Sequence, residues 1–278
     1  MPAPSSLSWP RRWTDDGPSP LAQVAPTQAV WHGLTLDTRA AQATERGLSP
    51  LEFLALLLDD ELERRDQQRL AHRLALSGCD SQKTLAHFDF AAAPGVNRSL
   101  IQDLAMCTFV ARHENILICG PTGVGKSHLA NGLAFEAIKR GYRVLSRTTQ
   151  RLLADLHAAR ATGAHPRLLS RVLSADLVVL DDFGLQPFSA QAAQDLYEII
   201  SERYERKSLI ITSNRAFEEW AEVFVGNELL ASATLDRLTH HAHTLIIRGH
   251  SYRQRSRRRE VTGSLAASPA DNSASISP

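Results

Sequence analysis

Cysteine, aromatic residues and an excess of charge of either sign are all scarce in this 278-residue sequence. The cysteines, Cys79, Cys107 and Cys119, lack the spacing of a metal site or a disulfide framework, which predicts reduced, buried thiols. The 31 basic and 30 acidic residues nearly cancel, so the overall charge identifies no partner. No apolar run approaches the roughly 20 residues that span a bilayer, and no signal-peptide core is present. We therefore expect a cytoplasmic protein with no membrane contact.

The composition divides the chain into four segments. Residues 1–35 are rich in proline and small polar residues, and we expect them to be a disordered extension. Residues 36–80 are rich in helix formers and predict a small helical module. Residues 81–253 alternate between apolar runs and helical patterns and form the predicted core domain. Residues 254–278 begin with basic residues and end in a tail that we expect to be disordered.

The helical module contains one long predicted helix that begins near Ser49. Ser49 and Glu52 have the spacing of a capping box, with proline at the first helical position. An apolar stripe follows, made of Leu51, Leu54, Leu58, Leu62, Leu70 and Leu74. Arginines decorate the other faces at positions 64, 65, 69 and 73. Two interpretations stay open: a solvated amphipathic helix that packs on the core, or a module that contacts DNA phosphates or a partner protein.

The stretch Gly120–Ser127, Gly-Pro-Thr-Gly-Val-Gly-Lys-Ser, fits the phosphate-binding pattern GxxxxGK[ST]. An apolar strand-like run precedes it, and apolar residues at helical spacing follow. Glycines let backbone N–H groups surround phosphate oxygens, and the next helix presents its positive end to the same anion. Lys126 is expected to reach the β- and γ-phosphates, and Ser127 to ligate Mg²⁺. The expected nucleotide contacts are Gly120, Pro121, Thr122, Gly123, Val124, Gly125, Lys126, Ser127 and His128.

A second apolar run, residues 177–180, ends in Asp181 and Asp182. A carboxylate at the end of a strand beside the phosphate loop can hold the hydration shell of Mg²⁺, so Asp181 is the second candidate metal ligand. Asp182 is the candidate that orients or deprotonates the attacking water. The alternative is that two aspartates merely close a strand at the surface.

Asn214 and Arg237 are two further candidates. Asn214 follows the predicted strand 208–212, where its amide can bond the water or the γ-phosphate or simply form a turn. Arg237 lies late in an apolar helical segment. It either pairs with an acidic residue of its own subunit or reaches the γ-phosphate of a neighbouring subunit as an arginine finger.

Strands and helices alternate through the core domain, which predicts a parallel sheet with helices on both faces and a ligand site beyond the carboxyl ends of the strands. The predicted strands are 115–119, 142–146, 177–180, 208–212 and 244–247. The predicted helices are 100–112, 128–140, 149–160, 166–173, 190–204, 217–225 and 228–241. Residues 88–90 are expected to form an extended segment over the nucleotide site or a sheet edge.

With these motifs assembled, the chain resembles the IstB-like ATP-binding proteins, AAA+ helpers of insertion-sequence transposition related to the DnaC helicase loader. The resemblance covers about residues 39–253 and rests on six ordered stretches. They are Lys83–Phe90, the phosphate loop with Ser127–Ala130, Asp181–Gly184, Ile211–Asn214, Leu235–Leu238 with His240–His243, and Gly249–Arg253.

The resemblance implies an α/β AAA+ fold with a five-stranded sheet of order 5-1-4-3-2. Because little chain follows the fifth predicted strand, we expect no helical lid domain of the kind found in larger AAA+ proteins. It implies a Mg²⁺-dependent ATP hydrolase that forms a homo-oligomer on duplex DNA and assists a transposase. Asn214 would then sense the γ-phosphate, and Arg237 would be the arginine finger. Many AAA+ relatives carry glutamate where this chain has Asp182. The shorter side chain either slows hydrolysis or leaves the activation of water to a tilted backbone.

Three functional hypotheses therefore stay open: the transposition helper, a DnaC-like loader of a replicative helicase, and a nucleotide-dependent switch with negligible turnover. The first gains a candidate DNA contact from a basic run near the end of the core domain. Its members are Arg248, Arg253, Arg255, Arg257, Arg258 and Arg259. Such a run either neutralises DNA phosphates without reading sequence or is a solvated charged tail.

Overall fold

The computed structural model describes residues 29–249 and 251 of this chain. The chain divides into two compact units, one ending at Gln67 and the other beginning at Gln68. Most of the predicted N-terminal extension and all of the predicted tail, residues 254–278, lie outside the described residues. Helix α1 (Ala29–Arg46) begins before residue 36, where we placed the start of the helical module.

The first unit consists of α1 and the first part of α2 (Pro50–Ser77), which continues into the second unit. The capping box is present, since Glu52 Oε2 accepts from the Ser49 amide at 2.7 Å and Ser49 Oγ accepts from the Glu52 amide at 3.3 Å. Arg39 joins the two helices by two hydrogen bonds to Asp60, of 2.8 and 2.7 Å.

The leucine stripe of α2 does not behave as one surface. Leu70 and Leu74 pack against the core of the second unit. Leu51, Leu54, Leu58 and Leu62 are 51–79% exposed. The first half of the stripe is therefore largely exposed within its own unit, and both interpretations of this helix remain predictions.

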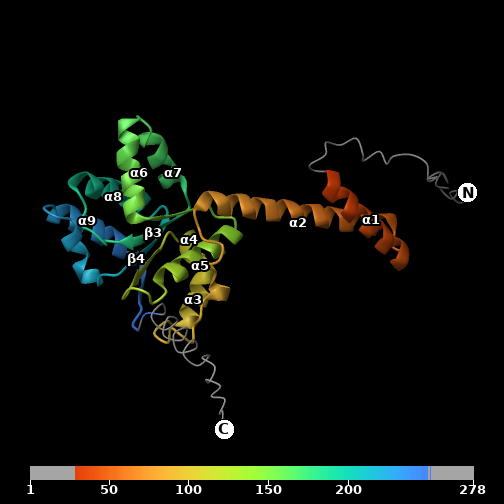
Figure 1. Cartoon of the computed structure of the whole chain (residues 1–278), viewed down its shortest axis with the longest axis horizontal. Coiled ribbons are helices and arrows are strands. Elements are labelled where there is room, and N and C mark those ends of the chain that lie inside the picture. The colour runs from red at the N-terminus through yellow and green to blue at the C-terminus, as the bar shows by residue number, and fades with distance from the viewer. Residues whose placement is uncertain (1–28, 250, 252–278) are drawn as a thin grey trace, which may run out of the picture. The chain divides into compact units, whose positions relative to one another are not determined.

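The second unit is built on a parallel five-stranded sheet with the order β2-β3-β4-β1-β5 (Figure 1). This confirms the predicted sheet and its order, read from the opposite edge. The strands are β1 (Asn115–Cys119), β2 (Val144–Thr148), β3 (Leu177–Phe183), β4 (Ser208–Ser213) and β5 (Ala242–Ile246).

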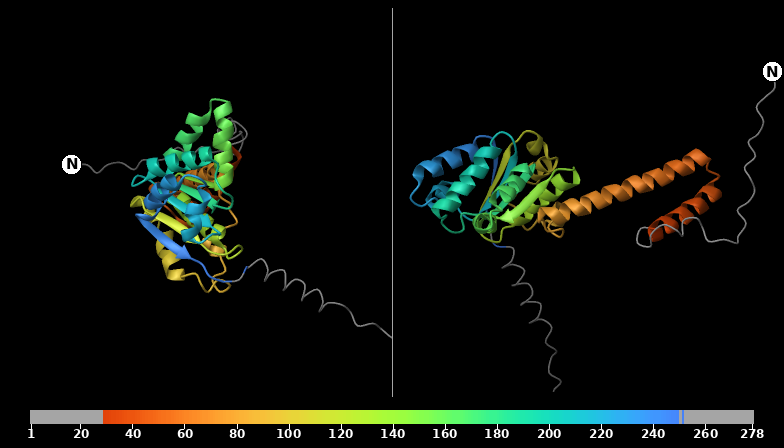
Figure 2. Two further views of the ribbon diagram at one scale, coloured as in Figure 1. Left: turned by 90° about the vertical axis from the view of Figure 1, so that its left-hand side faces the viewer. Right: turned by 90° about the horizontal axis from the view of Figure 1, so that it is seen from above.

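Helices cover both faces of the sheet (Figure 2). Alternate strand residues supply the two apolar layers: Ile116 and Ile118 of β1 face one side, and Leu117 faces the other. The first side carries η2 (Leu85–His87), α3 (Arg98–Ala105), α4 (Thr108–Ala111) and α5 (Lys126–Lys139). The second carries α6 (Thr149–Ala161), α7 (His165–Ser174), α8 (Ala190–Arg203), η3 (Phe217–Val223) and α9 (Glu228–Thr239).

Two predicted boundaries are wrong for local reasons. The helix predicted over residues 100–112 is broken into α3 and α4 at Cys107, whose φ of 60° is left-handed. Strand β2 starts two residues later than predicted, because the Tyr142 amide donates to Ala137 O and so completes the turn after α5.

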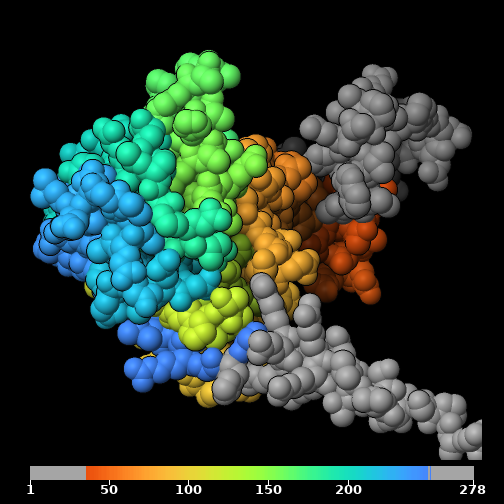
Figure 3. Space-filling model, turned by 60° about the vertical axis from the view of Figure 1, so that its left-hand side comes forward, coloured from red at the N-terminus to blue at the C-terminus, as the bar shows by residue number. Residues whose placement is uncertain are grey.

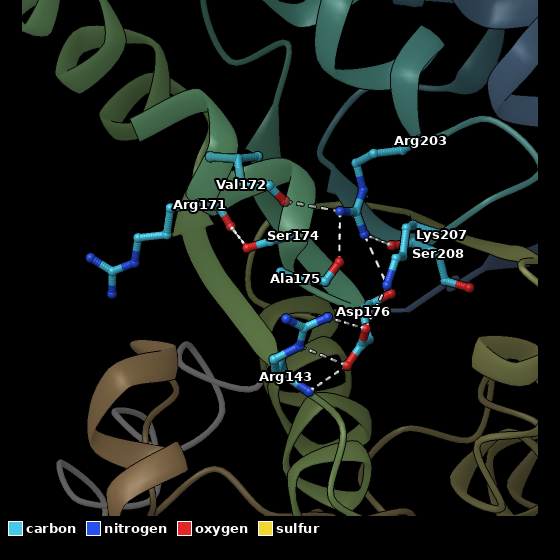
Figure 4. A network of polar contacts seen from close by, with 9 residues as sticks. All are labelled: Arg143, Arg171, Val172, Ser174, Ala175, Asp176, Arg203, Lys207 and Ser208. Atoms are coloured by element: carbon cyan, nitrogen blue, oxygen red, sulfur yellow. Dashed lines mark hydrogen bonds and ion pairs between the residues drawn. The ribbon is translucent and has the colours of Figure 1, made fainter. Parts of the chain in front are cut away.

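A polar network holds the amino ends of β2, β3 and β4 together (Figure 4). The buried Arg203 donates from Nη1 to the carbonyls of Val172 and Ala175, at 2.9 and 2.8 Å, and from Nη2 to that of Ser208 at 2.7 Å. Burial lowers the pKa of Arg203 to about 10, which Asp176 opposes. This network fixes the sheet at the end opposite to the predicted nucleotide site.

Candidate functional site

The phosphate loop connects β1 to α5 and depends on two glycines. Gly125 has a φ of 99° at the N-cap of α5, and a Cβ there would lie 2.7 Å from the ring of Phe88. Gly120 has a φ of 153°, and a Cβ there would lie 2.3 Å from Ile247 O. No other residue type fits either position without displacing its neighbour. The N-terminus of α5 therefore opens onto the loop with its backbone amides available to an anion.

Lys126 links this loop to the end of β4. Its Nζ donates to Pro121 O at 2.8 Å and to Asn214 Oδ1 at 2.6 Å. The side chain is 4% exposed, so its ammonium group is positioned inside the site rather than in bulk water. The two residues are 88 positions apart in the chain, and the pairing of β1 with β4 brings them together.

Asp181 is the centre of a second set of contacts. Ser127 Oγ donates to Asp181 Oδ1 at 2.9 Å, and Thr212 Oγ1 donates to the same oxygen. Thr149 Oγ1 donates to the Asp181 carbonyl at 3.1 Å. The two residues predicted as metal ligands, Ser127 and Asp181, are therefore in direct contact.

Asp182 occupies a bulge in β3. Leu180 pairs with Ile211 and Phe183 with Ser213, so Asp181 and Asp182 together lie opposite Thr212. The strand thus continues beyond residue 180, where we predicted its end. Asp182 has a φ of 53°, a left-handed conformation that aspartate tolerates better than most residues. Its amide donates to Thr212 Oγ1 at 3.1 Å, which fixes the bulge against β4.

The segment before α3 lies on the phosphate loop, as the extended segment predicted over residues 88–90 requires. The ring of Phe88 meets that of His128 edge to face at 5.3 Å between centroids. His128 Nε2 also bonds Thr84 O at 2.8 Å. Asn131 of α5 accepts from the Asp80 amide at 2.9 Å and donates to Lys83 O at 2.9 Å. These contacts seat the segment on the first turns of α5.

The sequence profile of the IstB-like ATP-binding proteins matches residues 32–260. The chain belongs to this family. The ATP-binding protein of insertion sequence IS21 from Pseudomonas aeruginosa is 39% identical over 218 residues, which cover 78% of this chain and 82% of that protein. The corresponding protein of insertion sequence IS5376 from Geobacillus stearothermophilus is 36% identical over 219 residues, covering 79% of this chain and 87% of that one.

Solved structures contain a fold similar to that of this IstB-like protein. A DNA replication initiation factor aligns with a TM-score of 0.54 and 20% identity, over 68% of this chain and 56% of that chain. At this identity the likeness concerns the fold alone.

Within the described part of the chain, no helix combines the length and the apolar composition that crossing a membrane requires.

Arg237 of this IstB-like protein is not part of the site within its own chain. Its Nη1 donates to Ala233 O at 2.9 Å, and its guanidinium lies 5.3 Å from the centroid of the Tyr197 ring. Among the described residues it forms no ion pair with aspartate or glutamate. The sequence left open an ion pair between Arg237 and an acidic residue of its own subunit, and no such pair is formed among the described residues.

Sequence reasoning assigned no role to Thr212 or Thr149, although both contact Asp181. Their positions in the sequence could have indicated these contacts. Thr212 is the penultimate residue of the strand on one side of Asp181, and Thr149 directly follows the strand on the other side. Cys119, just before the loop, is buried as predicted. Burial and Glu218 raise its pKa to about 11, which favours the protonated thiol at neutral pH.

Proposed function

We propose that this IstB-like protein binds ATP with Mg²⁺ at the loop Gly120–Ser127 and hydrolyses it. The observation that supports this best is the 2.9 Å contact between Ser127 Oγ and Asp181 Oδ1. Two adjacent oxygen ligands in an octahedral Mg²⁺ shell, each about 2.1 Å from the ion, lie about 3 Å apart. The two side chains therefore have the spacing that the ion needs, and both are oxygen donors of the kind it prefers.

Each remaining residue of the site receives one role in this proposal. Lys126 and the loop amides bind the phosphates, and Asn214, the present partner of Lys126, reads the γ-phosphate. The ion neutralises charge on the phosphates when it is bound. Asp182 orients the attacking water or accepts its proton. Its short side chain and its fixed backbone give slow turnover, which assembly or DNA would stimulate.

The proposal extends to assembly, because Arg237 forms no ion pair within its own chain among the described residues. We assign it to the γ-phosphate of a neighbouring copy, which makes hydrolysis depend on a homo-oligomer. Its present contacts with Ala233 and Tyr197 leave no acidic partner to be displaced among the described residues.

We further propose that the oligomer forms on duplex DNA and assists a transposase. The two relatives compared above are ATP-binding proteins of insertion sequences, which supports this role over that of a helicase loader. The run Arg248–Arg259 would contact phosphates, but only Arg248 of its arginines lies within the described residues, where it is exposed. Arg64 and Arg65 are weaker candidates, because both pair with Glu61 at 2.7 Å. We place the protein in the cytoplasm, in line with its free cysteines.

One experiment tests the core of this proposal: sedimentation or electron microscopy of the full chain with duplex DNA, with and without ATP and Mg²⁺. We expect an ATP-dependent assembly on DNA. Lys126→Ala should weaken ATP binding about 10- to 100-fold and abolish the assembly. Lys139→Ala is the matched control, since this lysine lies on the same helix and pairs at the surface with Glu136. Unchanged ATP affinity in Lys126→Ala would overturn the site.

A separate measurement distinguishes the two partner classes. The protein should copurify with the transposase of its own element when ATP and DNA are present, and not with a replicative helicase. Capture of the helicase alone would favour the loader hypothesis.

A further inference from the structure

The sequence His240-His241 belongs to the family resemblance, but the proposed ATP chemistry gives it no role. It lies between the end of α9 and the start of β5. The strands of this sheet are parallel, so the amino end of β5 is at the edge opposite to the phosphate loop. Figure 3 shows the segments coloured teal to blue, which include α8 and α9, next to one another on one side of the molecule.

A glutamate from the end of α8 completes a cluster with these two histidines. Glu205 Oε1 lies 3.7 Å from His240 Nδ1 and 3.5 Å from His241 Nε2. One possible ligand atom from each of the three residues lies within 4.8 Å of the other two. The two imidazole rings are neighbours, with 4.1 Å between their centroids. Glu205 has a φ of 57°, which turns the chain just after α8 and directs this residue to the end of α9.

Glu205 supplies the negative charge of the cluster. Among the described residues, no lysine or arginine forms an ion pair with Glu205; its ion-pair partners are the two histidines. Asp236 lies one turn before His240 on α9, with Arg237 beside it. All three cluster side chains are about half exposed, so an ion in solution can reach them.

We propose that Glu205, His240 and His241 form a binding site for Zn²⁺. Zn²⁺ takes histidine nitrogen and carboxylate oxygen at about 2.0–2.2 Å, which places tetrahedral ligand atoms about 3.3–3.5 Å apart. The observed 3.5 and 3.7 Å are close to this spacing, so small side-chain rotations complete the site. Two imidazole ligands select Zn²⁺ over Mg²⁺ or Ca²⁺, which prefer oxygen.

Tyr204 competes with the metal ion for one of the ligand atoms. Its hydroxyl lies 2.7 Å from His240 Nδ1, the same nitrogen that faces Glu205. The metal must displace this hydrogen bond. Tyr204→Phe should therefore bind Zn²⁺ roughly 2- to 10-fold more tightly than the native chain, by the strength of one hydrogen bond.

A metal ion at this site would link two helices and stabilise the fold. Glu205 follows α8 and the histidines follow α9, so one ion would tie the carboxyl ends of two neighbouring helices together. A ligand that binds only the folded chain raises its stability. Zn²⁺ should therefore raise the melting temperature.

The test is a titration of the full, tag-free chain with Zn²⁺, and with Co²⁺ followed by its visible absorption, in the absence of nucleotide. We expect 1:1 binding that weakens at least about 100-fold in His240→Ala, His241→Ala and Glu205→Gln. His243→Ala is the matched control: it removes a histidine two residues away, which pairs with Glu114 at 2.8 Å, and should leave the affinity unchanged.

Circular dichroism establishes that each variant is folded, and the melting temperature gives a second readout. Zn²⁺ should raise it in the native chain and in His243→Ala but not in His240→Ala. Equal Zn²⁺ affinity in the native chain and in both alanine variants of the cluster would overturn the site. So would a clear loss of affinity in Tyr204→Phe, which would exclude Nδ1 as the ligand atom.

Discussion

The ammonium group of Lys126 and the side-chain oxygen of Asn214 are joined by a hydrogen bond of 2.6 Å. The lysine begins α5, and the asparagine follows β4, so this bond connects the phosphate loop to the neighbouring strand. A phosphate that draws Lys126 toward itself competes with Asn214 for the same protons. The pair therefore links occupancy of the loop to the position of the β4 end.

Two substitutions of Asn214 separate binding from hydrolysis. Asn214→Ala should leave ATP affinity within about 10-fold, while the turnover number falls about 10²- to 10³-fold, as for the loss of one donor to developing charge. Asn214→Asp should instead weaken ATP binding, because a carboxylate would hold the ammonium of Lys126 and repel phosphate. Equilibrium binding of a fluorescent ATP analogue and single-turnover hydrolysis measure the two effects. Full turnover in Asn214→Ala would remove this residue from the chemistry.

Asp182→Asn should preserve ATP binding and slow hydrolysis by about 10²- to 10⁴-fold, the usual contribution of a general base. Asparagine accepts a left-handed backbone as readily as aspartate, so the bulge at φ 53° should be retained. The variant should accumulate as an ATP-bound assembly on DNA, visible by electron microscopy. Turnover at the native rate would show that the water is activated elsewhere.

Arg237→Ala should slow hydrolysis about 10³-fold or more if the arginine acts on a neighbouring copy. Mixing it with Lys126→Ala subunits tests this directly. The first variant keeps an intact phosphate loop, and the second keeps an intact arginine, so mixed interfaces should regain activity. Native turnover of Arg237→Ala at every protein concentration would place the finger on another residue.

Asp176 should make stability depend on acid pH. Burial would raise its pKa, but hydrogen bonds from Arg143 and Lys207 outweigh burial and hold the pKa well below its usual range. A depressed folded-state pKa stabilises the protein above the unfolded pKa of about 3.9, and this contribution is lost as pH falls further. Asp176→Asn should lower the free energy of unfolding by about 1–3 kcal/mol at pH 7 and reduce its decline between about pH 5 and pH 2.

Asp155→Asn is the control for that measurement, because Asp155 pairs with Arg151 on the surface of α6. It should change the free energy of unfolding by less than about 1 kcal/mol. Urea denaturation at a series of pH values measures both variants. If the free energy of unfolding of Asp176→Asn changed with pH in parallel with that of the native chain, Asp176 would not be the source of the acid dependence.

Most of this fold could be predicted from the sequence, because the motifs that indicate it are short, contiguous stretches. The phosphate loop is one contiguous stretch, and Asp181 follows a short apolar run, rich in valine and leucine, that is typical of a buried strand. The contact between Ser127 and Asp181 then follows from the topology of a parallel sheet.

What the sequence did not predict depends on contacts between distant segments. The bulge at Asp182 exists because two residues face Thr212 alone, and only strand register can show that. The exposed Leu51 and Leu58 fit an amphipathic pattern, but the pattern does not say what covers it. The break at Cys107 likewise lies inside a continuous helical pattern.

Thr212 has one hydroxyl hydrogen, and it gives that hydrogen to Asp181 while its oxygen accepts from the Asp182 amide. The polarity of this three-member chain is therefore fixed, from backbone amide through hydroxyl to carboxylate. Position 212 therefore requires a hydroxyl group more than it requires a side chain of a particular volume. Serine would preserve the relay although it is smaller, whereas valine, which has nearly the volume of threonine, would leave an amide and a carboxylate oxygen without their shared partner.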